Sequence, residues 1–171
     1  MIESNGINSI YFFDESRFGT HSKLGHGWFK KGKRTNVPIK LGFENFYIYS
    51  AISPSTGNDF TLVIPHVNTD CMNAFLEEMS NYLHRSQATI IMDRASWHKS
   101  KKLIIPNNIK IVYLPPYSPE LNPVERLWLY LKANIIRNKV YETIETLKDS
   151  VCTFIAQLTN EFLRSMCSIN Y

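Results

Sequence analysis

Three acidic residues that lie far apart in the chain are the candidates for chemistry. Asp14 follows the apolar run IYFF, Asp93 follows the apolar run TIIM, and Glu125 lies in LPPYSPELNPVERLW, after four prolines. Carboxylates from separate segments suit two hard divalent cations such as Mg²⁺, which prefer oxygen ligands. Two such ions activate an attacking oxygen and stabilise the leaving oxygen of a phosphodiester. The trio therefore predicts phosphoryl transfer on nucleic acid.

Two strands and one helix have to position these acids. The runs before Asp14 and Asp93 are β-branched, aromatic or aliphatic, which is typical of buried strands. If the strands are neighbours, the two carboxylates meet at the sheet edge where ligands bind in α/β folds. Glu125 joins them if the helix that begins near Asn122 packs across that edge. The prolines before this helix restrict the backbone and thereby fix where it begins.

Each acid also has an ordinary structural explanation. Asn122 suits a helix N-cap and Pro123 suits the first helical position, so Glu125 falls where it would complete a capping box. An Asp at the end of a strand is commonly a turn or cap residue. These alternatives stay open on spacing alone, and the coincidence of three acids favours a site.

Two long segments carry basic residues and no acid. No Asp or Glu occurs between Ser16 and Phe43 or between Arg94 and Pro119. A solvated surface explains most such runs, but each of these begins just after a candidate acid. A polyanion along both runs would bring its phosphates close to the carboxylates, and its binding would weaken steeply with salt. His98 lies five residues after Asp93, where a surface or capping role competes with a catalytic one. The candidate DNA contacts are Lys30, Lys31, Lys33, Arg34, Arg94, His98, Lys99, Lys101 and Lys102.

Composition and missing motifs exclude several other classes. The chain has 171 residues and 44% hydrophobic content, enough for one domain with a core. Its three cysteines form no CxxC pair, and no apolar run approaches the roughly 18 residues of a membrane span. No GxSxG, P-loop or HExxH motif is present. A single soluble, intracellular domain is the expectation.

The remaining pattern predicts an α/β fold with a mixed sheet flanked by helices. The segments GWFKKGK, FYIYSAI and DFTLVIP read as an antiparallel meander. An amphipathic helix follows from Asp70, with Thr69 or Asp70 as its cap, and IKIVYL is a further strand. One long helix is expected from Ile144 to Phe162.

The segments FFDESRFG, IIMDRASWHKS and LPPYSPELNPVERLW, in this order, resemble the catalytic domain of the IS630/Tc1/mariner superfamily of transposases, in its IS630-like bacterial branch. The resemblance implies a ribonuclease H-like fold and a DDE triad of Asp14, Asp93 and Glu125. It also implies Mg²⁺ or Mn²⁺ as the cofactor. Our hypothesis is that the site holds two such ions, with Asp14 bridging both, Asp93 binding one and Glu125 binding the other. The implied reaction is cleavage of double-stranded DNA at terminal inverted repeats and joining of the 3′ ends at a TA target.

Two departures from the family pattern shape the remaining expectations. Arg94 stands where such enzymes often carry Asn, and the catalytic pattern begins almost at Met1, with no N-terminal helix-turn-helix domain. We therefore expect a single catalytic domain over residues 1–171, acting as a homodimer in a bacterial or archaeal cytoplasm near the nucleoid. An upstream-frame helix-turn-helix polypeptide is a possible partner. The alternatives are a ribonuclease H-like nuclease or resolvase without strand transfer, and a DNA-binding transposase remnant that does not cut.

Overall fold

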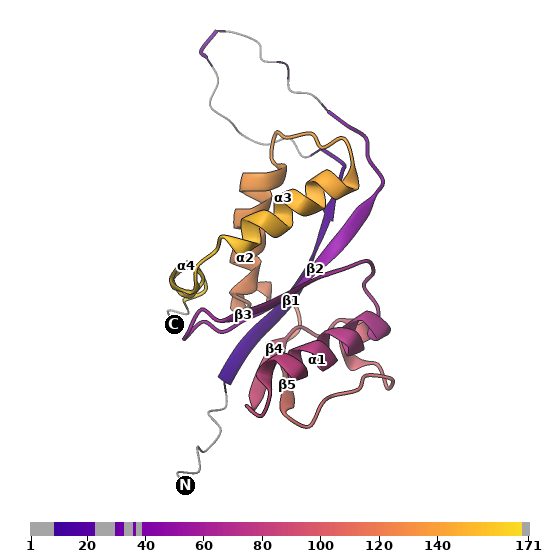
Figure 1. The fold of residues 1–171 in the computed structure, drawn as a ribbon, viewed down its shortest axis with the longest axis vertical. Helices are drawn as coiled ribbons and strands as arrows, with labels where there is room; N and C mark the ends of the chain where they lie inside the picture. Colours follow the sequence, from indigo (N-terminus) through magenta and orange to yellow (C-terminus); the bar gives the residue numbers. More distant parts are fainter. Residues whose placement is uncertain (1–8, 23–29, 33–35, 37–38, 169–171) are drawn as a thin grey trace.

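A five-stranded mixed sheet forms the centre of the molecule (Figure 1). A computed structural model describes residues 9–22, 30–32, 36 and 39–168 of the chain. The strand order is β3-β2-β1-β4-β5, with β1, β2 and β3 antiparallel and β4 and β5 parallel to β1. The strands are β1 (Ser9–Gly19), β2 (Asn45–Ile52), β3 (Asp59–Ile64), β4 (Ala88–Met92) and β5 (Ile109–Tyr113). The predicted mixed sheet is confirmed.

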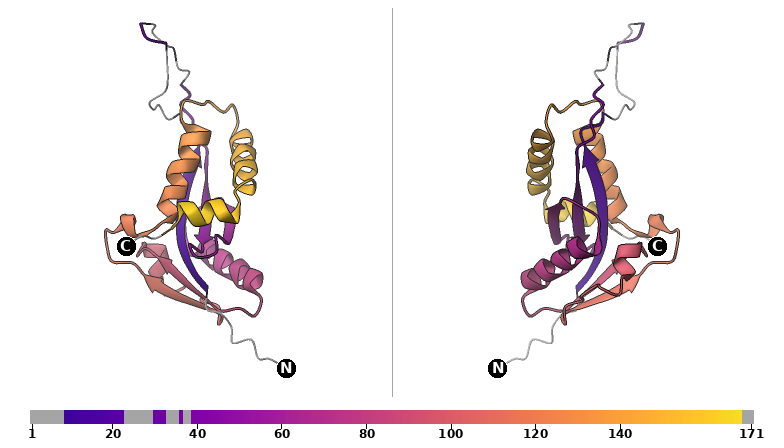
Figure 2. Two further views of the ribbon diagram at one scale, coloured as in Figure 1. Left: turned by 90° about the vertical axis from the view of Figure 1, so that its left-hand side faces the viewer. Right: turned by 90° about the vertical axis from the view of Figure 1, so that its right-hand side faces the viewer.

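Helices cover both faces of this sheet (Figure 2). One face carries α1 (Thr69–Leu83), and the other carries α2 (Val124–Leu131), α3 (Ile144–Ala156) and α4 (Asn160–Met166). Successive side chains of a strand point to opposite faces, so β1 supplies both cores. Phe13 packs with the α1 layer, whereas Phe12 and Phe18 pack with the α2 layer. No helix in the described part of the chain is long and apolar enough to cross a membrane.

Several local expectations need correction. Asn68, rather than Thr69 or Asp70, caps α1, because its side-chain oxygen accepts the amide of Cys71. The long C-terminal helix is two helices, since α3 ends at Ala156 and the Thr159 side chain caps α4. The segment GWFKKGK lies mostly outside the described residues, and its described part, 30–32, is not a strand. The meander instead consists of β1, β2 and β3.

Strand lengths decide where the first two acids lie. β1 continues to Gly19 because it stays paired with β2, so Asp14 lies within a strand and not at its end. The parallel pairing of β1 with β4 stops at Phe12 opposite Ile91. Two further residues along each strand direction bring Asp14 level with Asp93, at the point where β4 has ended and β1 continues with only β2 as its neighbour.

Candidate active site

The three predicted acids line one cavity. It has a volume of about 490 Å³ and opens where β4 and β5 end beside the start of α2. The structure thus brings together Asp14 from β1, Asp93 after β4 and Glu125 from the first turn of α2. The remaining lining residues are Arg94, Ala95, Lys99, Leu114, Pro115, Pro116, Tyr117, Ser118, Pro119 and Asn122.

Asp14 is the most enclosed of the three acids. Its Oδ2 accepts a hydrogen bond of 2.8 Å from the indole N–H of Trp128, one helical turn beyond Glu125. Burial, followed by the charges of Glu15 and Glu125, raises the pKa of Asp14 to about 8, and the bond from Trp128 only partly offsets these effects. A group that brings positive charge to this position would therefore relieve an unfavourable cluster of carboxylates.

Asp93 is held through a single oxygen. Its Oδ1 accepts the backbone amide of Ala95 at 3.0 Å and contacts Nδ1 of His98 at 2.8 Å. The hydrogen bond from His98 is the largest cause of a lowered pKa for Asp93. Because both bonds converge on Oδ1, Oδ2 is the oxygen that remains for a bound cation.

His98 lies inside the fold, between two carboxylates. Its side chain is 1% exposed, and Nε2 lies 3.4 Å from Oε2 of Glu15, whose Oε1 accepts the indole N–H of Trp97 at 3.1 Å. Burial lowers the pKa of His98, but the hydrogen bond to Asp93 and the nearby carboxylate of Glu15 outweigh burial and raise the pKa to about 9. A DNA contact, which the sequence suggested for His98, does not fit this buried position. The ring instead fixes the orientation of Asp93.

Glu125 does not complete a capping box. The Asn122 amide that such a box requires donates to the carbonyl of Pro119, and the Glu125 side chain is exposed at the cavity. Asn122 is 4% exposed and acts as a bridge. Its Oδ1 accepts the amide of Val124 at 3.2 Å, while its Nδ2 donates to the carbonyl of Phe13 at 2.9 Å. The start of α2 is therefore tied to β1 directly beside Asp14.

The proline-rich segment forms one wall of the cavity. It leaves β5 with the Leu114 amide bonded to the carbonyl of Met92, and Nε of Arg94 donates to the Leu114 carbonyl at 3.1 Å. Arg94, the departure from the family pattern, thus braces the loop after β4 against the first residue of this wall. Arg94 is also part of the cavity lining.

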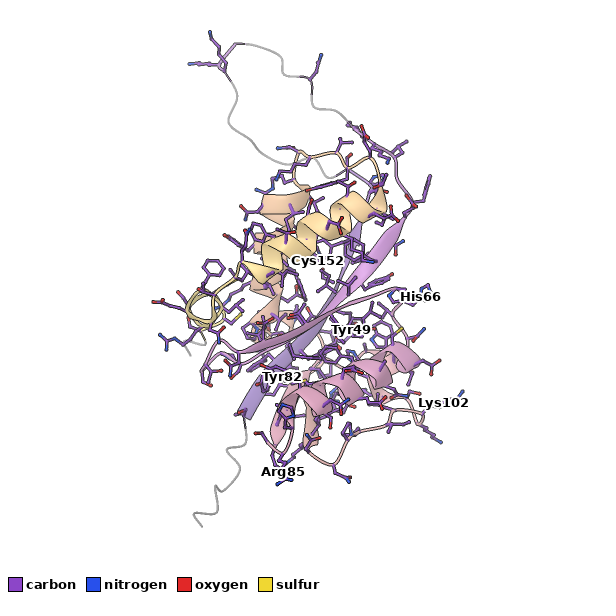
Figure 3. All side chains as sticks on the ribbon, viewed as in Figure 1. Tyr49, His66, Tyr82, Arg85, Lys102 and Cys152 are labelled. Atoms are coloured by element: carbon purple, nitrogen blue, oxygen red, sulfur yellow. The ribbon has the colours of Figure 1, made fainter. Side chains whose placement is uncertain are left out.

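The predicted DNA contacts divide into groups. Arg94 and Lys99 are exposed and line the cavity. Lys101 and Lys102 are exposed but do not line it, and the Lys102 carbonyl bonds to Asn73 of α1 (Figure 3). Lys30 and Lys31 are exposed in the segment between β1 and β2, and Lys33 and Arg34 lie outside the described residues. Of the seven candidates among the described residues, Arg94 and Lys99 line the cavity with the acids, and His98 contacts Asp93 from inside the fold.

Comparison with known proteins shows the family. A family model described as DDE superfamily endonuclease matches residues 9–148. The chain belongs to this family.

Two of the relatives carry names from the superfamily that the motifs of this chain resemble. An uncharacterised protein of Sinorhizobium fredii, y4pE/y4sA, is 34% identical over 116 residues, covering 67% of this chain and 86% of that protein. The insertion element IS630 39 kDa protein of Shigella sonnei is 26% identical over 80% of this chain. The Tc3 transposase of Caenorhabditis elegans is 25% identical over 93% of this chain. The expected placement among IS630/Tc1/mariner transposases is confirmed.

Solved structures confirm the ribonuclease H-like fold of a transposase catalytic domain. The Mos1 transposase paired-end complex with left transposon end aligns over 94% of this chain with a TM-score of 0.71 and 17% identity. The Mos1 paired-end complex with Mn aligns with a TM-score of 0.70. This chain spans about half of the Mos1 chain, 52%, and 41% and 52% of the Shigella and Caenorhabditis relatives.

The carboxylate oxygens of the three cavity acids are chemically suitable ligands for a hard divalent cation. The three cavity acids offer carboxylate oxygens, and the raised pKa of Asp14 reports unfavourable negative charge that a cation would compensate. In the described residues, no three His, Cys, Asp or Glu side chains are grouped closely enough to hold a metal ion. Glu125 is exposed on the first turn of α2, so its side chain has freedom to approach the other two acids.

Sequence reasoning missed three residues that hold the site together. Trp128 was assigned to the apolar stripe of α2, Asn122 to a helix cap, and Glu15 received no role. The signal for Glu15 was a second acidic residue directly after Asp14 in a strand with a buried core on each face, because alternation places Glu15 on the opposite face from Asp14. The signal for Trp128 was its spacing from Glu125, since two residues that are three positions apart lie on the same face of a helix.

We expect the Asn122 bridge to be important for stability. Asn122→Ala leaves the buried carbonyl of Phe13 and the amide of Val124 without partners, which should lower the free energy of unfolding by about 1–3 kcal/mol. Urea denaturation measures this, with Asn107→Ala as the control because Asn107 is exposed. Equal stability of the two variants would contradict the bridge.

The raised pKa of Asp14 predicts a pH-dependent stability without metal. The folded state binds this proton more tightly than the unfolded state, so the stability that it contributes is complete below about pH 4 and is lost as pH rises through about 8. Asp14→Asn keeps an acceptor for Trp128 but carries no charge. In chelator, its advantage over the wild type should grow between these pH values to the order of 2 kcal/mol. Urea denaturation across pH measures this, and a constant difference would refute the prediction.

Proposed function

We propose that this chain is the catalytic domain of a transposase that cleaves DNA at transposon ends and transfers the freed strand into target DNA. Asp14, Asp93 and Glu125 are its catalytic carboxylates. One observation carries the proposal: acids from three distant segments line a single cavity, in a chain that belongs to the DDE endonuclease family. The relatives named IS630 and Tc3 transposase support transposition as the biological setting.

The cavity acids would hold Mg²⁺ or Mn²⁺, in two-ion form, and Mos1 complexes with Mn and with Mg support this choice. Bound cations would supply activation of the attacking oxygen and charge stabilisation at the leaving oxygen. Asp14 would bind from a strand that is packed on both faces and paired with β2. His98 holds Oδ1 of Asp93, which leaves Oδ2 for a cation. Glu125 approaches from a helix whose start is tied to β1 by Asn122.

The polyanion that binds in this cavity would be double-stranded DNA. It would be the terminal inverted repeat of the transposable element in the cleavage step and a TA-containing target in the joining step. Arg94 and Lys99 line the cavity beside the acids, where their cationic groups would contact phosphates next to the scissile bond. The Mos1 structures include a paired-end complex with a transposon end and a strand transfer complex, which supports both steps for this fold.

End recognition and synapsis would require further protein. This chain spans about half or less of the Shigella and Caenorhabditis relatives, so a helix-turn-helix domain or polypeptide is the natural partner for reading the inverted repeats. Synapsis of two ends would bring two catalytic domains together as a homodimer. A nuclease or resolvase without strand transfer remains the competing function, and a joining assay with a pre-cut 3′ end distinguishes the two.

Metal-dependent nicking tests the three acids. Asp14→Asn, Asp93→Asn and Glu125→Gln should each reduce Mn²⁺-dependent nicking of a duplex carrying the inverted repeats by about 100-fold or more, because bound ions contribute several kcal/mol to the transition state. Glu120→Gln is the matched control, since Glu120 is exposed five residues earlier and does not line the cavity. Full nicking by any of the three variants would remove that residue from the triad, and nicking by none of the proteins would favour a non-catalytic remnant.

Salt dependence tests the two cavity cations. Lys99→Gln should weaken DNA binding across sequences and reduce the slope of log affinity against log salt by about 1, because one phosphate contact is lost. Fluorescence anisotropy over a salt series measures this slope. Lys102→Gln is the control on the same loop, and an equal change in both variants would show that the contact is not specific to the cavity.

A further inference from the structure

Tyr117 is an unusual residue on the cavity wall. Its relative exposure is 101%, so the ring packs against nothing in the described part of the chain. Its φ is 58°, in the left-handed region that Gly and Asn favour and that a bulky residue rarely occupies. The fold therefore holds a large aromatic ring in solvent on a strained backbone.

Neither feature helps the isolated fold. An exposed ring contributes little burial, and a left-handed tyrosine is less favourable than asparagine at the same position. Strained backbone of this kind persists only where the surrounding structure imposes it, and such strain is concentrated at functional sites. The observations thus point to a contact that Tyr117 makes with something outside the chain.

The surrounding segment restricts the backbone on which Tyr117 stands. Pro115 and Pro116 precede Tyr117 and Pro119 follows it, and proline restricts both its own φ and the residue before it. Ser118 Oγ donates to the carbonyl of Pro116 across the turn. The loop backbone therefore has few alternative conformations, and it keeps Tyr117 in the lining that also contains the three acids.

We propose that Tyr117 is the stacking platform for one nucleobase of the DNA strand whose phosphodiester occupies the cavity. This inference rests on the proposed function. A base adjacent to the scissile phosphate would leave the duplex stack and place its face on the tyrosine ring, while Arg94 and Lys99 contact neighbouring phosphates. Stacking on an aromatic side chain accepts any base, so the contact would position the strand without reading its sequence.

Two substitutions distinguish the contribution of the Tyr117 ring to DNA binding from the contributions of its hydroxyl and of the backbone conformation. Tyr117→Phe keeps the ring and removes the hydroxyl, and should bind DNA as the wild type does. Tyr117→Asn removes the ring but suits the positive φ, so its melting temperature should stay equal or rise while DNA binding falls roughly 5- to 150-fold. His84→Asn is the matched control, because His84 is exposed with a φ of 52° and lies outside the cavity lining.

A cycle between protein and DNA tests the stacking itself. The probe is a fluorescein-labelled duplex carrying the inverted repeat, with single abasic sites placed in turn on either side of the cut. One abasic position should weaken binding by the wild type and by Tyr117→Phe, yet have no further effect on Tyr117→Asn. Additive effects at every position, or equal losses for Tyr117→Phe and Tyr117→Asn, would overturn the stacking proposal.

Nicking of the intact duplex with Mn²⁺ is measured on the same wild-type preparation. If the protein nicks DNA but the abasic site and Tyr117→Asn act additively, the stacking proposal is wrong and the proposed function is supported. Coupling without nicking supports the platform and counts against the catalytic function. Absence of both DNA binding and nicking would overturn both.

Discussion

The attachment of α2 to β1 is the constraint on which the cavity depends. Asn122 joins the carbonyl of Phe13 to the first amides of the helix, and one turn later Trp128 donates to Asp14. These bonds fix the direction in which α2 leaves the sheet, and therefore the side from which Glu125 faces the cavity. Because the bridge is buried, water cannot replace it without loss of stability.

This attachment holds together groups that repel each other. Burial and the charges of Glu15 and Glu125 raise the pKa of Asp14, which shows that the fold maintains carboxylates closer than their charges favour. Hydrophobic packing on both faces of β1 opposes that repulsion, since Phe12, Phe13 and Phe18 are almost fully buried. A site that is unfavourable without a cation is also a site that gains free energy when a cation binds.

The sequence predicts the elements better than their junctions. Periodicity was sufficient for the mixed sheet and for α1 and α2, because apolar spacing reports which face is buried. It failed for Asp14, since the length of β1 is set by pairing with β2, a contact distant in sequence. It left the role of His98 open and placed it among the DNA contacts, because its burial between Asp93 and Glu15 depends on how the turn after β4 folds back. The convergence of the acids was predicted, but the contacts that orient them were not.

The two faces of β1 have separate tasks at the cavity. Asp14 is held from the α2 side through Trp128, whereas Glu15, the next residue, faces the α1 side and reaches Asp93 through His98. Alternation along one strand thus lets a single segment orient two carboxylates by independent routes. Neither route occupies the open side of the cavity, where the prolines and Tyr117 form the wall. Asp14 and Asp93 are consequently fixed from within the fold, and the open side of the cavity remains accessible to a substrate as large as a DNA strand.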